Sequence, residues 1–454
     1  MERKADRFSS RTGFVLATVG SAVGLGSIWK FPYEAGQHGG GTFLLFYAIG
    51  LALVVLPLLL AEFVIGRHGR ADAAASLQSA ALAAGRSPAW RWVGLAGILT
   101  GFVILTYYAV IAGMTMAYVP HAALRGFAGI DAAASAAAFA ELTGSPVALG
   151  LWQAAFLAAA AAVVARGVRA GVEAACTVLM PLLGILMVGL VIYGVVAGDA
   201  GRAARFLLGV RLDAVSPGAA LEALGLGFFS IGVGMGVMIT YAAYAGETFD
   251  LRGAALATVL GDTAISLLAG FAIFPIVFAE GLDPAGGATL MFLTLPIAFG
   301  ALPFGDLLGG CFFLLLFVAA LASGISLIEV VVAPLVRRTG WSRARATVTV
   351  AATAWVLGLP AMLSFNLWAG VRPLGAGTLF DLSDGLASNL LLPLCGLALS
   401  LFAGWRLPRA IYAAELTTAR RGGTWLLPVL VVLLRWIVPG VIVAYTAAAH
   451  LPRF

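Results

Sequence analysis

The sequence predicts an all-α integral membrane protein with two inverted repeats of five helices, of which helices 1 and 6 are discontinuous, and an eleventh transmembrane helix. Hydrophobic residues make up 61% of the 454-residue chain and charged residues only 11%, whereas soluble domains carry about 25% charged residues. Apolar runs recur at roughly the 20-residue length that crosses a bilayer. Two of these runs, at matching positions in the two halves, are rich in glycine. The composition therefore makes the lipid bilayer the expected surroundings of this chain.

Eleven stretches are long and apolar enough to span a bilayer as helices. In chain order they cover residues 12–36, 42–66, 90–122, 146–165, 172–197, 220–246, 253–281, 304–336, 345–364, 376–404 and 424–449. A shorter apolar stretch from Thr289 to Phe299 contains Pro296 and is flanked by glycines, which indicates a loop helix. These spans divide the chain into the following predicted segments: a tail over 1–11, a core over 12–404 with repeats over 12–197 and 220–404, and a loop with the eleventh helix over 405–454.

The basic residues predict the orientation of the chain. With the N-terminus inside, nineteen Lys and Arg residues fall in cytoplasmic segments and six in outside segments. The positive-inside rule then favours a cytoplasmic N-terminal tail, and the odd number of spans places the C-terminus outside. The basic residues form short runs between spans and no continuous stripe, which argues against a nucleic-acid partner.

The sequence shows no residue set typical of an enzyme or a metal centre. The three cysteines lie inside apolar runs and have neither metal nor disulfide spacing. The four histidines lie at predicted loop ends, away from the glycine-rich centre, so they suggest neither a metal site nor a catalytic triad. A phosphate-binding loop is also missing, which argues against an ATP-driven pump. We therefore expect no catalytic residues.

Glycine-rich stretches in the first and sixth spans predict unwound segments. The first is Gly20–Ser27, and the second is Phe229–Gly236, in which three glycines alternate within five positions. Each glycine costs about 1 kcal/mol relative to alanine in a helix interior, and unwound backbone at membrane depth needs partners. The positive ends of half-helices attract a carboxylate, and freed carbonyls suit a small hard cation. Close helix packing is the alternative explanation, but the matching positions favour an inverted-repeat transporter.

The motifs of this sequence resemble the neurotransmitter:sodium symporter family over nearly the whole chain. The most specific part runs from Gly20 to Gly41 and contains GLGSIWKFPY followed by three glycines. Further matching residues are Pro57, Ala61, Glu62, Gly66, Arg67, Tyr107, Tyr108, the stretch 228–236, Ile239, Thr240, Tyr241, Phe380, Asp381 and Asp384. The resemblance implies the family fold, a bacterial inner-membrane location, and an amino-acid substrate bound beside two sodium sites.

The resemblance also implies the residues of each site. The first sodium site would use the Ala22 carbonyl, Ser27, Ser230 and Asp262, together with the substrate carboxylate. The second would use the carbonyls of Gly20, Val23 and Ala319 and the Ser323 hydroxyl. The substrate would contact Ala22, Leu25, Gly26, Ile104, Tyr108, Phe229, Ser230, Gly232, Met235, Ser323 and Leu327. The Leu25 and Gly26 amides and the Tyr108 hydroxyl would bind the carboxylate, and the mostly apolar remainder implies a hydrophobic side chain.

Three departures from the family bear on the ions. Ser27 stands where the family usually has asparagine, and Ala322 where it usually has threonine, so we expect one or two Na⁺ ions. Asp262 stands where animal members have asparagine, and its carboxylate could replace the chloride that those members require. Chloride is therefore not expected to be needed, although Tyr47 and Ser266 form a possible anion site.

Lys30 and Asp384 match the extracellular gate of the family, an arginine–aspartate pair. Lysine lacks the bidentate geometry of arginine, so a looser gate is expected; the alternative is that both side chains face water. Glu62 matches a glutamate that caps unwound backbone. The cytoplasmic gate has no identified pair, because Ala5 and Arg337 occupy its two positions.

The function predicted from these observations is a sodium-coupled symporter that imports an amino acid by alternating access. Two alternatives remain open. One is a proton-coupled amino-acid transporter that uses Asp262 or Glu62, and the other is a non-transporting amino-acid sensor on the same fold. The identity of the amino acid, the sodium stoichiometry and the oligomeric state are left without a prediction.

Overall fold

The computed structural model describes residues 7–283, 290–373, 375, 377–416 and 426–450. Residues 1–6, 284–289, 374, 376, 417–425 and 451–454 lie outside this part of the chain. The predictions for most of the N-terminal tail, for Ala5, Thr289 and the last residues of the chain, and for the first residues of the tenth and eleventh spans therefore lie outside the described residues.

Helical segments occupy all eleven predicted positions. The first repeat contains α1 (Arg11–Ala22) with α2 (Phe31–Gln37), α3 (Gly41–Gly50) with α4 (Leu56–Gly69), α6 (Arg91–Leu124), α8 (Pro146–Val164) and α9 (Ala174–Ala197). The second contains α11 (Pro217–Ile231) with α12 (Val237–Ala243), α13 (Leu251–Ala279), α15 (Gly305–Thr339), α16 (Arg343–Leu363) and α17 (Leu379–Gly385) with α18 (Leu392–Trp405). The eleventh span is α20 (Leu426–Val432) with α21 (Val438–His450).

Within the described residues, nine helical segments are long and apolar enough to cross a membrane. The pair Arg11–Ala22 and Gly26–Gln37, bent by 51°, makes a tenth. Helices α11 and α12 are separate and together form the sixth span. The most apolar part of α15 is 78% buried, whereas that of the span Val168–Ala197 is only 28% buried. Helix α15 is therefore central in the bundle, and α9 presents most of its apolar surface outward, as a lipid-facing helix does.

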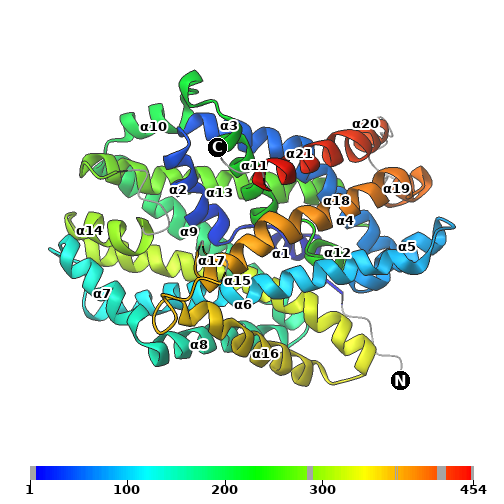
Figure 1. Cartoon of the computed structure of the whole chain (residues 1–454), viewed down its shortest axis with the longest axis horizontal. Helices are drawn as coiled ribbons and strands as arrows, with labels where there is room; N and C mark the ends of the chain where they lie inside the picture. The colour runs from blue at the N-terminus through cyan, green and yellow to red at the C-terminus, as the bar shows by residue number, and fades with distance from the viewer. Residues whose placement is uncertain (1–6, 284–289, 374, 376, 417–425, 451–454) are drawn as a thin grey trace.

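Short helices gather at the two ends of the bundle (Figure 1). Helices α7 (Ala132–Gly144), α10 (Ala200–Leu208) and α14 (Leu295–Gly300) lie at one end, and α5 (Ala73–Ala83) and α19 (Arg409–Leu416) at the other. Helix α14 and the turn before it, Leu290–Thr294, confirm the predicted loop helix. The other four were not predicted, although the aspartates that cap α5, α7 and α10 are a signal for them: each accepts a hydrogen bond from the amide three residues on.

Wide π-helical turns precede a proline in several spans. The turns Gly26–Lys30, Leu51–Val55, Leu386–Leu391 and Leu433–Ile437 come just before Pro32, Pro57, Pro393 and Pro439 respectively. Proline has no N–H and its ring collides with the carbonyl four residues earlier, and in each case that carbonyl lies within the wide turn. The wider hydrogen-bonding pattern accommodates the proline, so these spans continue through it.

Candidate functional site

The first span breaks at Val23 and Gly24. Helix α1 ends at Ala22, and Val23 is extended, with φ −73° and ψ 99°. Carbonyls in the last turn of a helix have no partner four residues on, and amides in the first turn of the next helix have none four residues back. The carbonyls of Gly20 and Ala22 and the amide of Gly26 fall in these two turns. The predicted break in the first span is confirmed.

The sixth span breaks between Ile231 and Val237. Gly232, Gly234 and Gly236 have φ of 74°, 88° and 74°, a left-handed conformation that only glycine adopts without steric cost. The Gly234 N–H donates to Glu62 Oε1 at 2.9 Å, and Glu62 on α4 is fully buried. The predicted break and the predicted capping by Glu62 are therefore both present.

An internal cavity lies between the two breaks. All eleven residues predicted to contact the substrate line it: Ala22, Leu25, Gly26, Ile104, Tyr108, Phe229, Ser230, Gly232, Met235, Ser323 and Leu327. Three more lining residues, Ser21, Gly24 and Val237, were not predicted. Gly24 is needed for close approach, because a Cβ there would lie 2.5 Å from Ser323 Oγ and 3.3 Å from the Tyr108 hydroxyl oxygen.

The cavity has a polar and an apolar side. On the polar side, the Tyr108 hydroxyl donates to the Ala320 carbonyl at 3.4 Å and lies beside Ser323 and the Leu25 backbone. On the apolar side, a Cβ on Gly232 would lie 3.5 Å from Met235 Cε. The flexible methionine side chain therefore occupies the space beside Gly232 and can move out of it.

Hydroxyl groups converge on the buried carboxylate of Asp262, on α13. Its Oδ1 accepts hydrogen bonds from Ser27 at 2.5 Å and Ser230 at 2.7 Å, and its Oδ2 accepts one from Tyr47 at 2.5 Å. Asp262 is fully buried. Three of the four residues predicted for the first sodium site therefore meet, and Ala22 lines the same cavity as Ser230. An all-oxygen cluster with one negative charge fits a small hard cation.

The two residues of the possible anion site differ in their contacts. Tyr47 is engaged by Asp262, as described above. Ser266 lies one turn after Asp262 on α13, and its buried hydroxyl has no hydrogen-bond partner among the described residues. An anion at Ser266 would lie close to the Asp262 carboxylate, and like charges repel.

The second predicted sodium site lies where α15 approaches the break in α1. The Ser323 hydroxyl donates to the Ser21 carbonyl at 3.2 Å. Ala319, one turn earlier on α15, is fully buried, and so is Ala322. Carbonyl groups at the end of α1, the Ala319 carbonyl and the Ser323 hydroxyl are the predicted oxygen ligands here, and Ala322 supplies no second hydroxyl.

A second cavity lies beyond the first, toward Lys30 and Asp384. Leu25, Tyr108 and Phe229 line both cavities and so form the partition between them. Lys30 Nζ lies 4.0 Å from Asp384 Oδ2 and 5.3 Å from the centre of the Phe229 ring. The predicted gate residues therefore form an ion pair above this partition.

Hydrogen bonds and ion pairs close the side of the bundle opposite the Lys30–Asp384 pair, near Phe8. The Phe8 N–H donates to the Tyr244 carbonyl at 3.1 Å. The Tyr244 hydroxyl donates to Glu329 at 2.8 Å, and Arg343 pairs with the same fully buried carboxylate. Arg337, which had no predicted partner, pairs with Asp72. Most of these partners are far apart in the sequence, and no local sequence pattern predicts their pairing.

Known proteins are similar to this chain over most of its length. The family model described as "Sodium:neurotransmitter symporter family" matches residues 5–126 and 146–367. An uncharacterized sodium-dependent transporter of Bacillus subtilis, YhdH, is 36% identical over 96% of both chains. One from Haemophilus influenzae is 33% identical over 89% of this chain and 90% of its own. The crystal structure of MhsT in complex with L-phenylalanine matches with a TM-score of 0.89 and 38% identity, over 98% of this chain and 99% of that one.

Proposed function

Because the chain belongs to the sodium:neurotransmitter symporter family, we propose that it uses the sodium gradient to import a hydrophobic amino acid by alternating access. Family membership makes it a multi-pass, sodium-dependent transporter and not an enzyme. One observation supports the finer proposal most strongly: the cavity between the two breaks is lined by Leu25, Gly26 and Ser230, and Ser230 also belongs to the oxygen cluster around Asp262.

The proposed location is the bacterial inner membrane, with the N-terminus in the cytoplasm and the C-terminus outside. The excess of basic residues, nineteen against six, supports this orientation. The cavity at Lys30 and Asp384 then faces outward, and the ion pairs at Glu329 and Arg337 face the cytoplasm.

The proposed substrate has a large apolar side chain. Ile104, Met235 and Leu327 line the apolar side of the cavity, and Gly232 contributes no side chain. MhsT, the similar solved structure, has L-phenylalanine bound. We therefore propose that phenylalanine and amino acids of similar size are the preferred substrates.

Sodium and substrate are coupled through the first sodium site in this proposal. The substrate carboxylate completes an ion shell made by Ala22, Ser27, Ser230 and Asp262, so each ligand raises the affinity of the other. A second ion would be held by Gly20, Val23, Ala319 and Ser323. The Asp262 carboxylate supplies the negative charge beside the first ion, which removes the need for chloride at Tyr47 and Ser266.

A binding screen of the twenty amino acids tests the substrate and the ions together. Purified protein is tested at one pH with sodium chloride, sodium gluconate or choline chloride. We expect phenylalanine-sized substrates to bind in both sodium salts and to lose at least tenfold in affinity without sodium. Loss of binding in gluconate would contradict chloride independence. Equal affinity in sodium and choline, together with an affinity that changes when the screen is repeated at a second pH, would favour the proton-coupled alternative instead.

The gate gives a separate prediction. Lys30→Asp and Asp384→Lys each place two like charges at the mouth of the outer cavity, so each should lower the initial rate of uptake at least tenfold. The double variant restores an attractive pair at these positions and should recover part of that rate. Uptake of radiolabelled phenylalanine into cells that express equal amounts of each variant measures this. If the double variant is as impaired as the worse single variant, the two residues do not act as a pair.

A further inference from the structure

We propose that α19, the short helix between the tenth and eleventh spans, is a strut that holds the cytoplasmic side closed through an ion pair between Glu415 and Arg67. This inference rests on the alternating access proposed above. It adds two positioning residues to the transport cycle, neither of which contacts the substrate cavity. We define the strut as α19 together with its two attachments, Glu415 to α4 and Tyr412 to α18.

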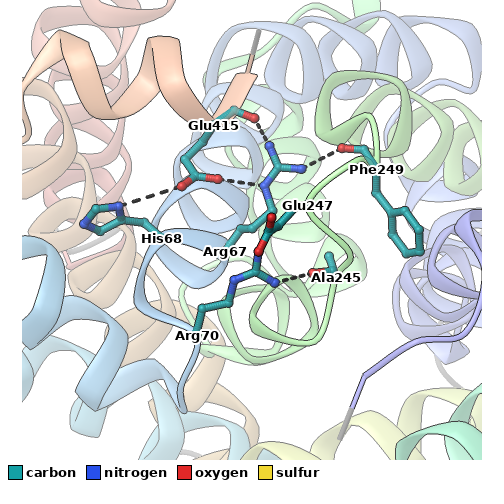
Figure 2. Close-up of polar contacts among 7 residues, drawn as sticks. All are labelled: Arg67, His68, Arg70, Ala245, Glu247, Phe249 and Glu415. Carbon is teal, nitrogen blue, oxygen red and sulfur yellow. Dashed lines mark hydrogen bonds and ion pairs between the residues drawn. The ribbon is translucent and has the colours of Figure 1, made fainter. Parts of the chain in front are cut away.

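Arg67, near the end of α4, joins three segments that are far apart in the sequence (Figure 2). Its Nε donates to Glu415 Oε2 at 2.7 Å, and its Nη2 donates to the Glu415 carbonyl. Its Nη1 donates to the Phe249 carbonyl at 2.6 Å. The Arg67 side chain is only 3% exposed. A guanidinium group has five N–H donors in a fixed plane, so a single side chain can make all three contacts.

The contacts of Arg67 and Arg70 bind the end of α4 to the loop between α12 and α13. Arg70 Nη1 donates to the Ala245 carbonyl at 2.5 Å and Nη2 lies 3.5 Å from Glu247 (Figure 2). The Phe249 ring contacts Phe14 on α1, with centroids 6.1 Å apart. Spans 1, 2, 6 and 7 are thus connected at their cytoplasmic ends. In the proposed alternating access, these four spans would therefore rock as one moving group against the rest of the bundle.

The other attachment of α19 is to the tenth span, outside that moving group. The fully buried Tyr412 donates its hydroxyl hydrogen to the Ala403 carbonyl, on α18, at 2.9 Å. Only three residues, 406–408, separate α18 from α19. Helix α19 is therefore attached both to the moving spans and to a span that does not rock with them, so rocking must break or stretch at least one of these two attachments.

The Glu415–Arg67 pair is the attachment that can open. The Glu415 side chain is 18% exposed, and His68 Nδ1 lies 3.8 Å from its Oε1 at the edge of the contact. Water can therefore solvate the two charges once they separate. The Tyr412 bond is enclosed by protein, and breaking it would leave a buried polar group without a partner, which is costly. An ion pair present only in the closed state shifts the population toward that state.

A native cysteine reports the opening without any transport measurement. Cys176, near the start of α9, is 1% exposed and lies close enough to Tyr241 to interact with it. The Tyr241 ring is covered by Phe8, with centroids 5.8 Å apart. Opening the cytoplasmic side moves Tyr241 on span 6, together with Phe8 before span 1, away from Cys176 on span 5, and so exposes Cys176 to a thiol reagent. The assay uses a background in which the other two cysteines, Cys311 and Cys395, are replaced by serine and alanine.

In this background, Glu415→Gln should raise the rate of Cys176 modification about tenfold in detergent-solubilised protein. Glu141→Gln is the matched control, because Glu141 on α7 also pairs with an arginine, Arg125, but is 62% exposed and lies at the other end of the bundle, and the rate of Cys176 modification in this variant should not change. Tyr412→Phe should also raise the rate of Cys176 modification. The double variant Glu415→Gln/Tyr412→Phe should exceed neither single variant by more than about twofold, because both changes disconnect one strut.

Two results would overturn the strut: an unchanged rate in Glu415→Gln, or independent, multiplying effects of the two changes. A global loss of fold in Glu415→Gln or Tyr412→Phe is recognised by a lowered melting temperature of that variant. Phenylalanine uptake is measured on the same variants. Absence of uptake in the unmodified chain would contradict the proposed function while leaving the labelling result to stand, whereas normal uptake with unchanged labelling would contradict the strut alone.

Discussion

Asp262→Asn is expected to lower sodium-dependent phenylalanine uptake at least a hundredfold. The carboxylate is the only charge in the oxygen cluster with Ser27, Ser230 and Tyr47. Two unit charges 4 Å apart attract by about 4 kcal/mol at an effective dielectric constant of 20, which is worth far more than a hundredfold in ion affinity. Asparagine keeps the size of the side chain, so the loss comes from charge and not from packing.

Asp213→Asn is the matched control, because Asp213 pairs with Arg211 on an exposed loop. Phenylalanine uptake by Asp213→Asn should equal that of the unmodified chain. Asp262→Asn should also become chloride-dependent, since the removal of the carboxylate leaves the Tyr47 and Ser266 hydroxyls free to bind an anion. Uptake of Asp262→Asn within threefold of the unmodified chain, with the same sodium dependence, would remove Asp262 from the sodium site.

Gly24→Ala is expected to weaken substrate binding at least a hundredfold. The added methyl group would lie 2.5 Å from Ser323 Oγ and 3.3 Å from the Tyr108 hydroxyl oxygen, distances at which atoms overlap. Either Ser323 moves away from the end of α1 or the break in the first span widens, and both changes displace proposed ligands of sodium and substrate. Equilibrium binding of labelled phenylalanine in saturating sodium measures the effect.

Gly184→Ala is the control for this change, because a Cβ at Gly184 of α9 would meet nothing within 4 Å. It should leave both binding and melting temperature unchanged. Unaltered phenylalanine affinity in Gly24→Ala would show that substrate binding does not need the close approach of α1 to Ser323 and Tyr108.

The sequence revealed the spans and their breaks because these depend on local physics. Alternating glycines at 232, 234 and 236 make a continuous helix costly and allow the left-handed backbone that the structure has there. Apolar length alone locates the spans, because a bilayer, unlike a soluble core, sets a fixed thickness. The lining residues of the cavity came from the resemblance to a family and not from local pattern, because they are contributed by four different spans.

Contacts between distant charged groups could not be predicted. Glu329 and Arg343 pair across a helix junction, Arg337 reaches Asp72, and Arg67 reaches Glu415. An arginine near a helix end could pair with any of several acidic residues, and the sequence alone does not show which of them the fold brings close. The short helices could have been found: residues 72–76 and 131–135 both read DAAAS, an aspartate cap followed by strong helix formers.

Sodium-coupled import is tested most directly by uptake of radiolabelled phenylalanine into proteoliposomes under an imposed sodium gradient. The inside is loaded with potassium buffer, the outside contains either sodium or choline, and pH is equal on both sides. We predict transient accumulation above the external concentration with sodium outside, and none with choline or with sodium equal on both sides. Accumulation driven by a proton gradient without sodium, or sodium-dependent binding with no uptake, would contradict sodium-coupled import.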